Sequence, residues 1–172
     1  VTRVEVDRDD PAFDKPTNAV GPSFSAECAK IMQHQHGWTM SGNAQGGLSR
    51  MIPSPRPRAI LSSRMIEQLA DSGACVICSG GGGIPVFRNE AGMMEGVAAI
   101  VDKDQTAALL AQSVNADVLL LLTHESGVFL EYGQPGQRAI RSTTPDGLAE
   151  VTGTPSSMKA KIAAAVRKVV GI

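Results

Sequence analysis

Apolar and polar positions follow two different patterns on either side of residue 60. Beyond it, continuous apolar runs at 74–79 and 117–123 alternate with segments whose apolar positions have helical spacing. Strands that are apolar on both faces, alternating with helices, are typical of a doubly wound α/β fold with a mainly parallel sheet. Helices are expected from Ser62 or Ser63 to Asp71, from Lys103 to Val114, at Thr144 or Pro145, and from Ser156 or Ser157 onward, with further strands at 96–102 and 127–133.

The first 58 residues are less regular and contain short elements. A strand is expected at 1–6, a loop at 7–22, a helix at 26–35 capped by Ser25, and short strands at 37–42 and 48–52. Three prolines in "PSPRPR" at 53–58 remove backbone donors and favour extended backbone, so this segment cannot form a helix or a central strand. We therefore predict an end strand with a small α+β subdomain at 1–58 and a larger α/β unit at 59–172.

The composition narrows the functional classes. Of the 172 residues, 42% are hydrophobic and only 3% aromatic, and the net charge is −1 with dispersed basic residues. Nucleic-acid binding normally needs a concentrated basic face, so it is not expected. The apolar runs are too short to span a bilayer, and the three cysteines argue against a complete disulfide framework. We predict a cytoplasmic protein that binds neither nucleic acid nor membrane.

Four consecutive glycines, Gly80–Gly83, follow the apolar run 74–79. Open α/β sheets bind ligands beyond the carboxyl ends of their strands, and bare backbone N–H groups there can face an anion. The run is not a Walker loop, because Ile84 and Pro85 follow it, and the extended pattern after it does not fit a dinucleotide loop. A phosphate or substrate site and a tight turn that needs positive φ both remain open.

Several other polar positions have two interpretations. Asp102, Lys103 and Asp104 lie where a strand would meet a helix, so the lysine could face a phosphate, or Asp102 could simply cap the helix. Cys75 and Cys78 have no second ligand pair and are read as buried structural cysteines. The remaining candidates are His34 and His36 without further ligands, His124 at a strand exit, and Arg56 and Arg58, which could hold phosphate or line a solvated junction.

Several segments in order resemble the carbamate kinases, a branch of the amino-acid kinase family. They are "VTRVEVDRDDPAF", "IPSPRPRAI", "VICSGGGGIPV", "GVAAIVDKDQTAALLA" and "NADVLLLLT", and together they extend over nearly the whole chain. The resemblance implies a three-layer αβα sandwich with a protruding subdomain. It also implies reversible phosphoryl transfer between carbamoyl phosphate and ADP, giving ATP and carbamate, in a Mg²⁺-dependent homodimer that serves arginine, agmatine or allantoin breakdown.

The resemblance also assigns site residues by position. Lys103 and Asp104 match the active-site "DKD" pair, and Lys161 matches the lysine of a "GSM-x-P-K" turn that reaches the phosphates. Gly80, Gly81, Gly82 and Gly83 match the substrate and phosphate loop. The implied nucleotide-binding residues are Thr123, His124, Tyr132, Gly133 and Met158. No metal ligand is assigned to the chain itself.

Three positions depart from the family pattern: Asn18 and His124 stand where the family has Lys and Asp, and Ser156 replaces a Gly. The family's N-terminal half, with the glycine loops that hold carbamate and phosphate, is not matched by any segment. The chain is therefore expected to supply the nucleotide half of a site. Acetylglutamate, uridylate or aspartate kinase activity is disfavoured by "PSPRPR", and a truncated or degenerate, non-catalytic nucleotide-binding or regulatory protein is the alternative.

Overall fold

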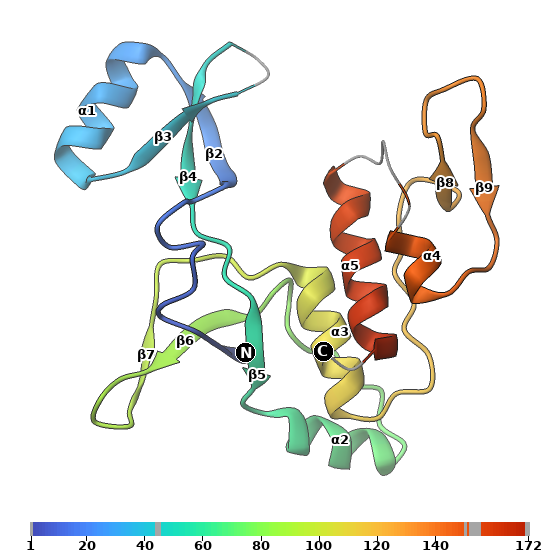
Figure 1. Ribbon diagram of the computed structural model, residues 1–172. Coiled ribbons are helices and arrows are strands. Elements are labelled where there is room, and N and C mark those ends of the chain that lie inside the picture. Colours follow the sequence, from blue (N-terminus) through green and yellow to red (C-terminus); the bar gives the residue numbers. More distant parts are fainter. Residues whose placement is uncertain (1, 44–45, 150, 152–155, 171–172) are drawn as a thin grey trace.

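A four-stranded mixed sheet organises the main body of the molecule (Figure 1). The structure is a computed structural model and describes residues 2–43, 46–149, 151 and 156–170. The sheet order is β5-β1-β6-β7, with bounds Pro57–Ile60, Arg3–Val6, Ile84–Arg88 and Met94–Gly96. The central β1–β6 pair is parallel, and the two outer pairs are antiparallel. Pro57 begins the edge strand β5, a position where a missing backbone donor costs no ladder hydrogen bond.

The protruding subdomain consists of a three-stranded antiparallel sheet and one helix, and it stands apart from the main body in Figure 1. Its order is β2-β4-β3, with bounds Asn18–Phe24, Leu48–Ile52 and Thr39–Gly42. The expectation of a loop through residue 22 is therefore wrong from Asn18 onward, because β2 pairs with β4 in spite of its Gly and Pro. Helix α1, Ala26–His36, begins as predicted, with the Ser25 hydroxyl accepting from the Cys28 N–H at 3.2 Å.

The longer helices lie together on one side of the main sheet (Figure 1). They are α2 at Ser63–Asp71, α3 at Lys103–Ser113 and α5 at Ser156–Val170, and α3 packs against both α5 and β5. The short helix α4, Pro145–Ala149, contacts α5, and the hairpin of β8, Val128–Leu130, and β9, Arg138–Ile140, extends beyond it. All four predicted helices in this part of the chain are present.

The core of the main body joins the sheet to α2 and α3. Its buried members are aliphatic, as the scarcity of aromatic residues requires: Val4, Val6, Ile60, Ile66, Val101 and Leu109. These residues come from β1, β5, α2, α3 and the segment before α3. Because Val4 and Val101 also border the glycine loop, the core fixes the position of the candidate site.

Three apolar segments that were predicted as strands do not form them. Residues 74–79 and 117–123 have no ladder partner among the described strands, and of 96–102 only Gly96 belongs to a strand. Ile77 is 97% exposed, while Val118 and Leu120 are 78% and 77% exposed. The strand predictions for these segments are wrong, because an apolar run becomes a strand only where another strand pairs with it.

The α/β class with a protruding α+β subdomain is confirmed. Among the described residues, no helix is long and apolar enough to cross a membrane. The predicted boundary at residue 58 stays a prediction; it falls within β5, which belongs to the main sheet.

Candidate functional site

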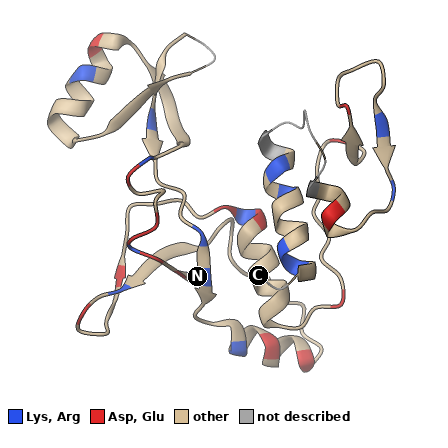
Figure 2. Ribbon diagram, viewed as in Figure 1, with Lys and Arg blue, Asp and Glu red and all other residues tan. Residues whose placement is uncertain are grey.

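The N-terminus of α3 brings together the acidic and basic residues of the "DKD" segment (Figure 2). Asp102 is the N-cap, and its Oδ1 accepts from the backbone N–H groups of Asp104 and Gln105, both at 2.9 Å. Capping satisfies two donors that a helix start otherwise leaves free. The capping interpretation of Asp102 is therefore confirmed, and it leaves Lys103 and Asp104 with separate roles.

Asp104 is the centre of a three-residue charge cluster. Its side chain is 8% exposed, and the carboxylate accepts from Lys161 Nζ at 3.0 Å on Oδ1 and 3.2 Å on Oδ2. Lys103 Nζ lies 3.8 Å from the same Oδ2. The Lys161 side chain is 14% exposed and the Lys103 side chain 66%, so Asp104 fixes the first ammonium while the second is free to move. The structure thus brings together all three predicted catalytic residues.

The glycine loop is tied to this cluster through Thr106 and Val101. Thr106 is fully buried, and its hydroxyl donates to the carbonyl oxygen of Gly82 at 2.9 Å, with the Asp102 carbonyl at 3.1 Å. A Cβ atom at Gly82 would overlap the backbone carbonyl of Val101. Gly82 is therefore glycine because the protein's own backbone occupies the space of a side chain.

The other three glycines are explained differently. Gly80 and Gly81 have φ of 58° and 111° with open space where a Cβ would lie, so backbone conformation alone favours glycine there. Gly83 combines φ of 84° with a close approach to Val4. Turn geometry and internal packing thus explain why these positions are glycine. The space beside Gly80 and Gly81 is also compatible with a phosphate or substrate site, so both interpretations stay open.

A cavity of about 490 Å³, the junction cavity, lies between the subdomain and the start of α3. Its lining comes from three parts of the chain: Thr17, Asn18 and Ser54 at the subdomain, Gly81 and Gly82 in the loop, and Ile100, Val101, Asp102 and Lys103 before and in α3. Gly81 and Gly82 of the predicted phosphate loop therefore share this cavity with Lys103, whereas Gly80 and Gly83 do not line it. Two polar side chains that were not predicted as site residues, Thr17 and Ser54, line it as well.

A second cavity of about 230 Å³, the α5 cavity, is lined by Lys161 of the charge cluster. Its lining is mainly apolar and includes Thr123, Met158 and Lys161, three of the predicted residues, together with Leu119 and Leu121. The alternate residues Val118 and Leu120 are exposed, as expected of an extended chain in which one face packs against a helix. Lys161 thus joins the α5 cavity to Asp104 and, through Asp104, to Lys103.

His124, Tyr132 and Gly133 do not line either cavity. His124 is exposed, and the Gly133 N–H donates to the Gln137 side chain at 2.7 Å within the β8–β9 hairpin. The Tyr132 hydroxyl donates to Glu125 Oε1 at 2.9 Å. This hydrogen bond, then the negative charge of Glu125, raise the pKa of Tyr132. These three predicted nucleotide residues therefore do not line the cavity that Thr123 and Met158 line.

The cysteines and histidines provide no metal centre in the described part of the chain. No group of three or more His, Cys, Asp or Glu side chains there is arranged to hold a metal ion. Cys75 is exposed and Cys78 half-buried, so the prediction of a buried Cys75 is wrong. His36 stacks on Trp38, with ring centroids 5.1 Å apart, in the subdomain.

Sequence reasoning missed Thr106, which joins the loop to α3. Its signal is weak, because a threonine inside a helix is ordinary, and only the fully buried hydroxyl next to a glycine carbonyl identifies its role. Thr17 and Ser54 were missed for a different reason. They reach the junction cavity from segments 37 positions apart in the sequence, which no local pattern connects.

Comparison with known proteins shows which protein family contains this fold and site. The family model described as the amino acid kinase family matches residues 19–170, most of the chain. The chain belongs to the amino acid kinase family. The matched range includes the glycine loop, the charge cluster, the α5 cavity and the lining of the junction cavity apart from Thr17 and Asn18, which precede it.

Curated relatives in this family include carbamate kinases. The chain is 44% identical over 164 residues to a carbamate kinase of Escherichia coli K12, covering 95% of the chain and 54% of the relative. It is 39% identical over 171 residues to one of Thermococcus kodakarensis, covering 97% of the chain and 54% of the relative. The chain therefore spans about half the length of the curated relatives it matches.

Solved structures agree with the sequence relatives. A crystal structure of an Aeropyrum pernix K1 protein has a TM-score of 0.92 at 37% identity, covering 99% of this chain and 56% of that one. The carbamate kinase of Giardia lamblia bound to AMP-PNP has a TM-score of 0.88 at 33% identity, covering 99% and 55%. The fold of the amino acid kinase family is thus shared over almost the whole chain.

Proposed function

We propose that this chain supplies the nucleotide-binding half of a carbamate kinase, which transfers a phosphoryl group reversibly between carbamoyl phosphate and ADP. The bond between the carbamate oxygen and phosphorus breaks, a bond from a terminal ADP oxygen to phosphorus forms, and carbamate leaves and decomposes to ammonia and CO₂. The similarity to carbamate kinases, one of them bound to AMP-PNP, supports this proposal. By the same similarity we propose a cytoplasmic homodimer.

One observation carries the proposal: the Lys103–Asp104–Lys161 cluster lies between two cavities. Phosphoryl transfer depends on positioning and charge neutralisation more than on covalent chemistry. The mainly apolar α5 cavity suits the nucleoside, and Lys161 at its edge suits the ADP phosphates. The exposed Lys103 beside Gly81 and Gly82 suits the transferring phosphoryl group. Asp104 is then a positioning residue that holds Lys161.

Mg²⁺ is proposed as the cofactor that accompanies the nucleotide. Such sites commonly hold Mg²⁺ through substrate phosphates and one or two carboxylates, and when bound the ion would neutralise phosphate charge. Among the described residues, Asp102 is the carboxylate that lines the junction cavity, but it caps α3, and the neighbouring Asp104 pairs with lysines. The donor set therefore fits an ion carried mainly by phosphate oxygens.

A second candidate function is a non-catalytic nucleotide-binding or regulatory protein. Asn18 lines the junction cavity with a neutral amide, and the chain covers about half of its relatives. A site with fewer cations and fewer loops would hold nucleotide without completing transfer. This candidate shares the α5 cavity with the first one, so nucleotide binding alone does not distinguish them.

Two measurements together test both candidates. Calorimetry of the chain with Mg-ADP reports binding, and a coupled assay on a preparation that contains both halves of the kinase domain reports ATP formed from carbamoyl phosphate and ADP. Binding with turnover supports the kinase, and binding without turnover supports the non-catalytic candidate. A folded sample that binds no Mg-ADP contradicts both.

A further inference from the structure

A cavity of about 780 Å³ lies between α5 and the segments that lead into and out of the subdomain. Four basic residues line it, Arg56, Arg58, Lys159 and Arg167, and we call it the basic cavity. No predicted site residue of the kinase lines it. The resemblance to carbamate kinases assigned no role to these side chains, and the sequence left Arg56 and Arg58 as either a phosphate site or a solvated junction.

The two carboxylates of the basic cavity are already engaged. Asp7 forms an ion pair with the Arg58 guanidinium. Asp10 accepts from the backbone N–H groups of Ala12 at 2.8 Å and of Arg56 at 3.0 Å. Within the described part of the chain, the side chains of Arg56, Lys159 and Arg167 have no carboxylate within ion-pair distance. Three cationic groups therefore line one cavity without a counter-anion.

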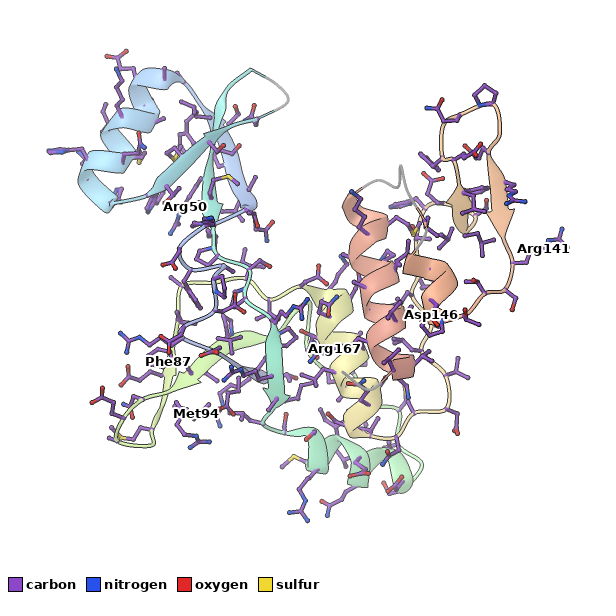
Figure 3. All side chains as sticks on the ribbon, viewed as in Figure 1. Arg50, Phe87, Met94, Arg141, Asp146 and Arg167 are labelled. Carbon is purple, nitrogen blue, oxygen red and sulfur yellow. The ribbon has the colours of Figure 1, made fainter. Side chains whose placement is uncertain are left out.

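Arg167 gives the most direct sign that an anion is expected there. It lies on the side of α5 that faces β5 (Figure 3), and its Nη2 donates to the Pro57 carbonyl at 2.9 Å. Its Nε is buried and has no hydrogen-bond partner in the described residues. Burial, and secondly the positive charge of Arg56, lower the pKa of Arg167. Two neighbouring guanidinium groups without an anion between them repel each other, and a bound oxyanion would remove that repulsion.

We propose that the basic cavity binds a phosphate-type oxyanion carried by a small molecule, at a site separate from the one used for phosphoryl transfer. The planar guanidinium fork matches phosphate oxygens in pairs, and Lys159 adds a third positive charge. Leu148, Ile162 and Val166 add apolar surface to the lining, and this surface accommodates an uncharged part of the ligand. The site thus selects a phosphorylated organic molecule over a bare ion.

The basic cavity and the α5 cavity are neighbours, so the test must show that the oxyanion and ADP bind at different sites. They share Leu148 and Ile162 as lining residues, whereas Lys159 lines one and Lys161 the other. ADP at saturation occupies the phosphate-binding side of Lys161 if the proposed function holds. A probe that still binds under these conditions reports the basic cavity.

The experiment is calorimetric titration of pyrophosphate into the chain at constant ionic strength, with and without saturating Mg-free ADP. The test variants are Arg56→Gln and Lys159→Gln, whose side chains are exposed, so folding is expected to be unaffected. The matched controls are Arg138→Gln in β9 and Lys30→Gln in α1, which remove the same charge at exposed positions outside the cavity. Circular dichroism of each variant confirms folding.

Pyrophosphate is expected to bind the chain both with and without ADP. Its dissociation constant should be about tenfold higher in each test variant, which corresponds to a loss of about 1.4 kcal/mol in binding free energy. It should be unchanged in both controls. Equal affinity in all variants, no binding by the unsubstituted chain, or displacement of pyrophosphate by ADP each overturns the proposal. If ADP fails to bind while pyrophosphate binding depends on Arg56 and Lys159, the proposed function fails and the basic cavity stands.

Discussion

Lys161 on α5 donates to both carboxylate oxygens of Asp104 on α3, at 3.0 and 3.2 Å. The two residues are 57 positions apart, and both side chains are largely buried. The pair therefore does two things at once. It joins the two helices that pack most extensively in the main body, and it fixes one ammonium group at the edge of the α5 cavity.

Asp104→Asn is expected to destabilise the chain, because it leaves the Lys161 ammonium in a mostly buried place without a carboxylate. Removing one partner of a buried pair costs about 3–5 kcal/mol, and the retained amide oxygen and the partial exposure of Lys161 bring the expected loss to about 1–3 kcal/mol. Urea unfolding followed by circular dichroism measures it. Asp9→Asn, at an exposed carboxylate, is the control and should change stability by less than about 0.5 kcal/mol. Equal effects of the two variants would show that the pair adds no stability.

Gly82→Ala is expected to be far more damaging than Gly80→Ala. At Gly82 the new methyl group overlaps the Val101 carbonyl, so the loop or the start of α3 must move. At Gly80 the space is open and the cost is that of a left-handed residue, about 1–2 kcal/mol. We expect Gly82→Ala to lose more than about 3 kcal/mol or to fail to fold. Unfolding curves of both variants measure the two losses of stability. A small loss in Gly82→Ala would mean that the loop does not contact Val101.

Tyr132 is expected to titrate above the ordinary tyrosine pKa of 10.0, because its hydroxyl donates to Glu125. The folded state then holds this proton more tightly than the unfolded state does. The resulting contribution to stability is present below the unfolded pKa and is lost as the pH rises through the folded pKa. Tyr132 is the only tyrosine, so phenolate absorbance against pH measures it directly. Glu125→Gln should lower the midpoint, and an unchanged midpoint would exclude the hydrogen bond.

Local signals in the sequence were enough to predict the helices. Ser25 and Asp102 cap α1 and α3 through hydrogen bonds that span two or three residues, so each helix start is determined by adjacent residues. The apolar runs at 74–79 and 117–123 were misassigned because strand formation depends on a distant partner. Ile77 and Leu120 show the consequence, since both are apolar and exposed in the described structure.

The charge cluster was predictable only through resemblance to known kinases, because composition and spacing left Lys103 as a possible solvated residue. The distances that join Lys103, Asp104 and Lys161 come from the packing of α3 on α5, which sequence alone does not provide. The role of Gly82 was also out of reach, because its neighbour Val101 is 19 positions away. Non-local contacts thus account for most of what was missed.

Lys103→Ala, in a preparation that forms ATP from carbamoyl phosphate and ADP, is expected to lower the rate on the order of 10²-fold. The ammonium neutralises charge that grows as the phosphoryl group transfers, so the loss should appear mainly in kcat. The Lys103 side chain is 66% exposed, so stability should stay nearly constant, which separates this effect from that of Asp104. Lys30→Ala, at an exposed position in the subdomain, is the matched control and should leave the rate unchanged. A wild-type rate in Lys103→Ala would remove this residue from the mechanism and leave Lys161 as the cation that contacts the phosphates.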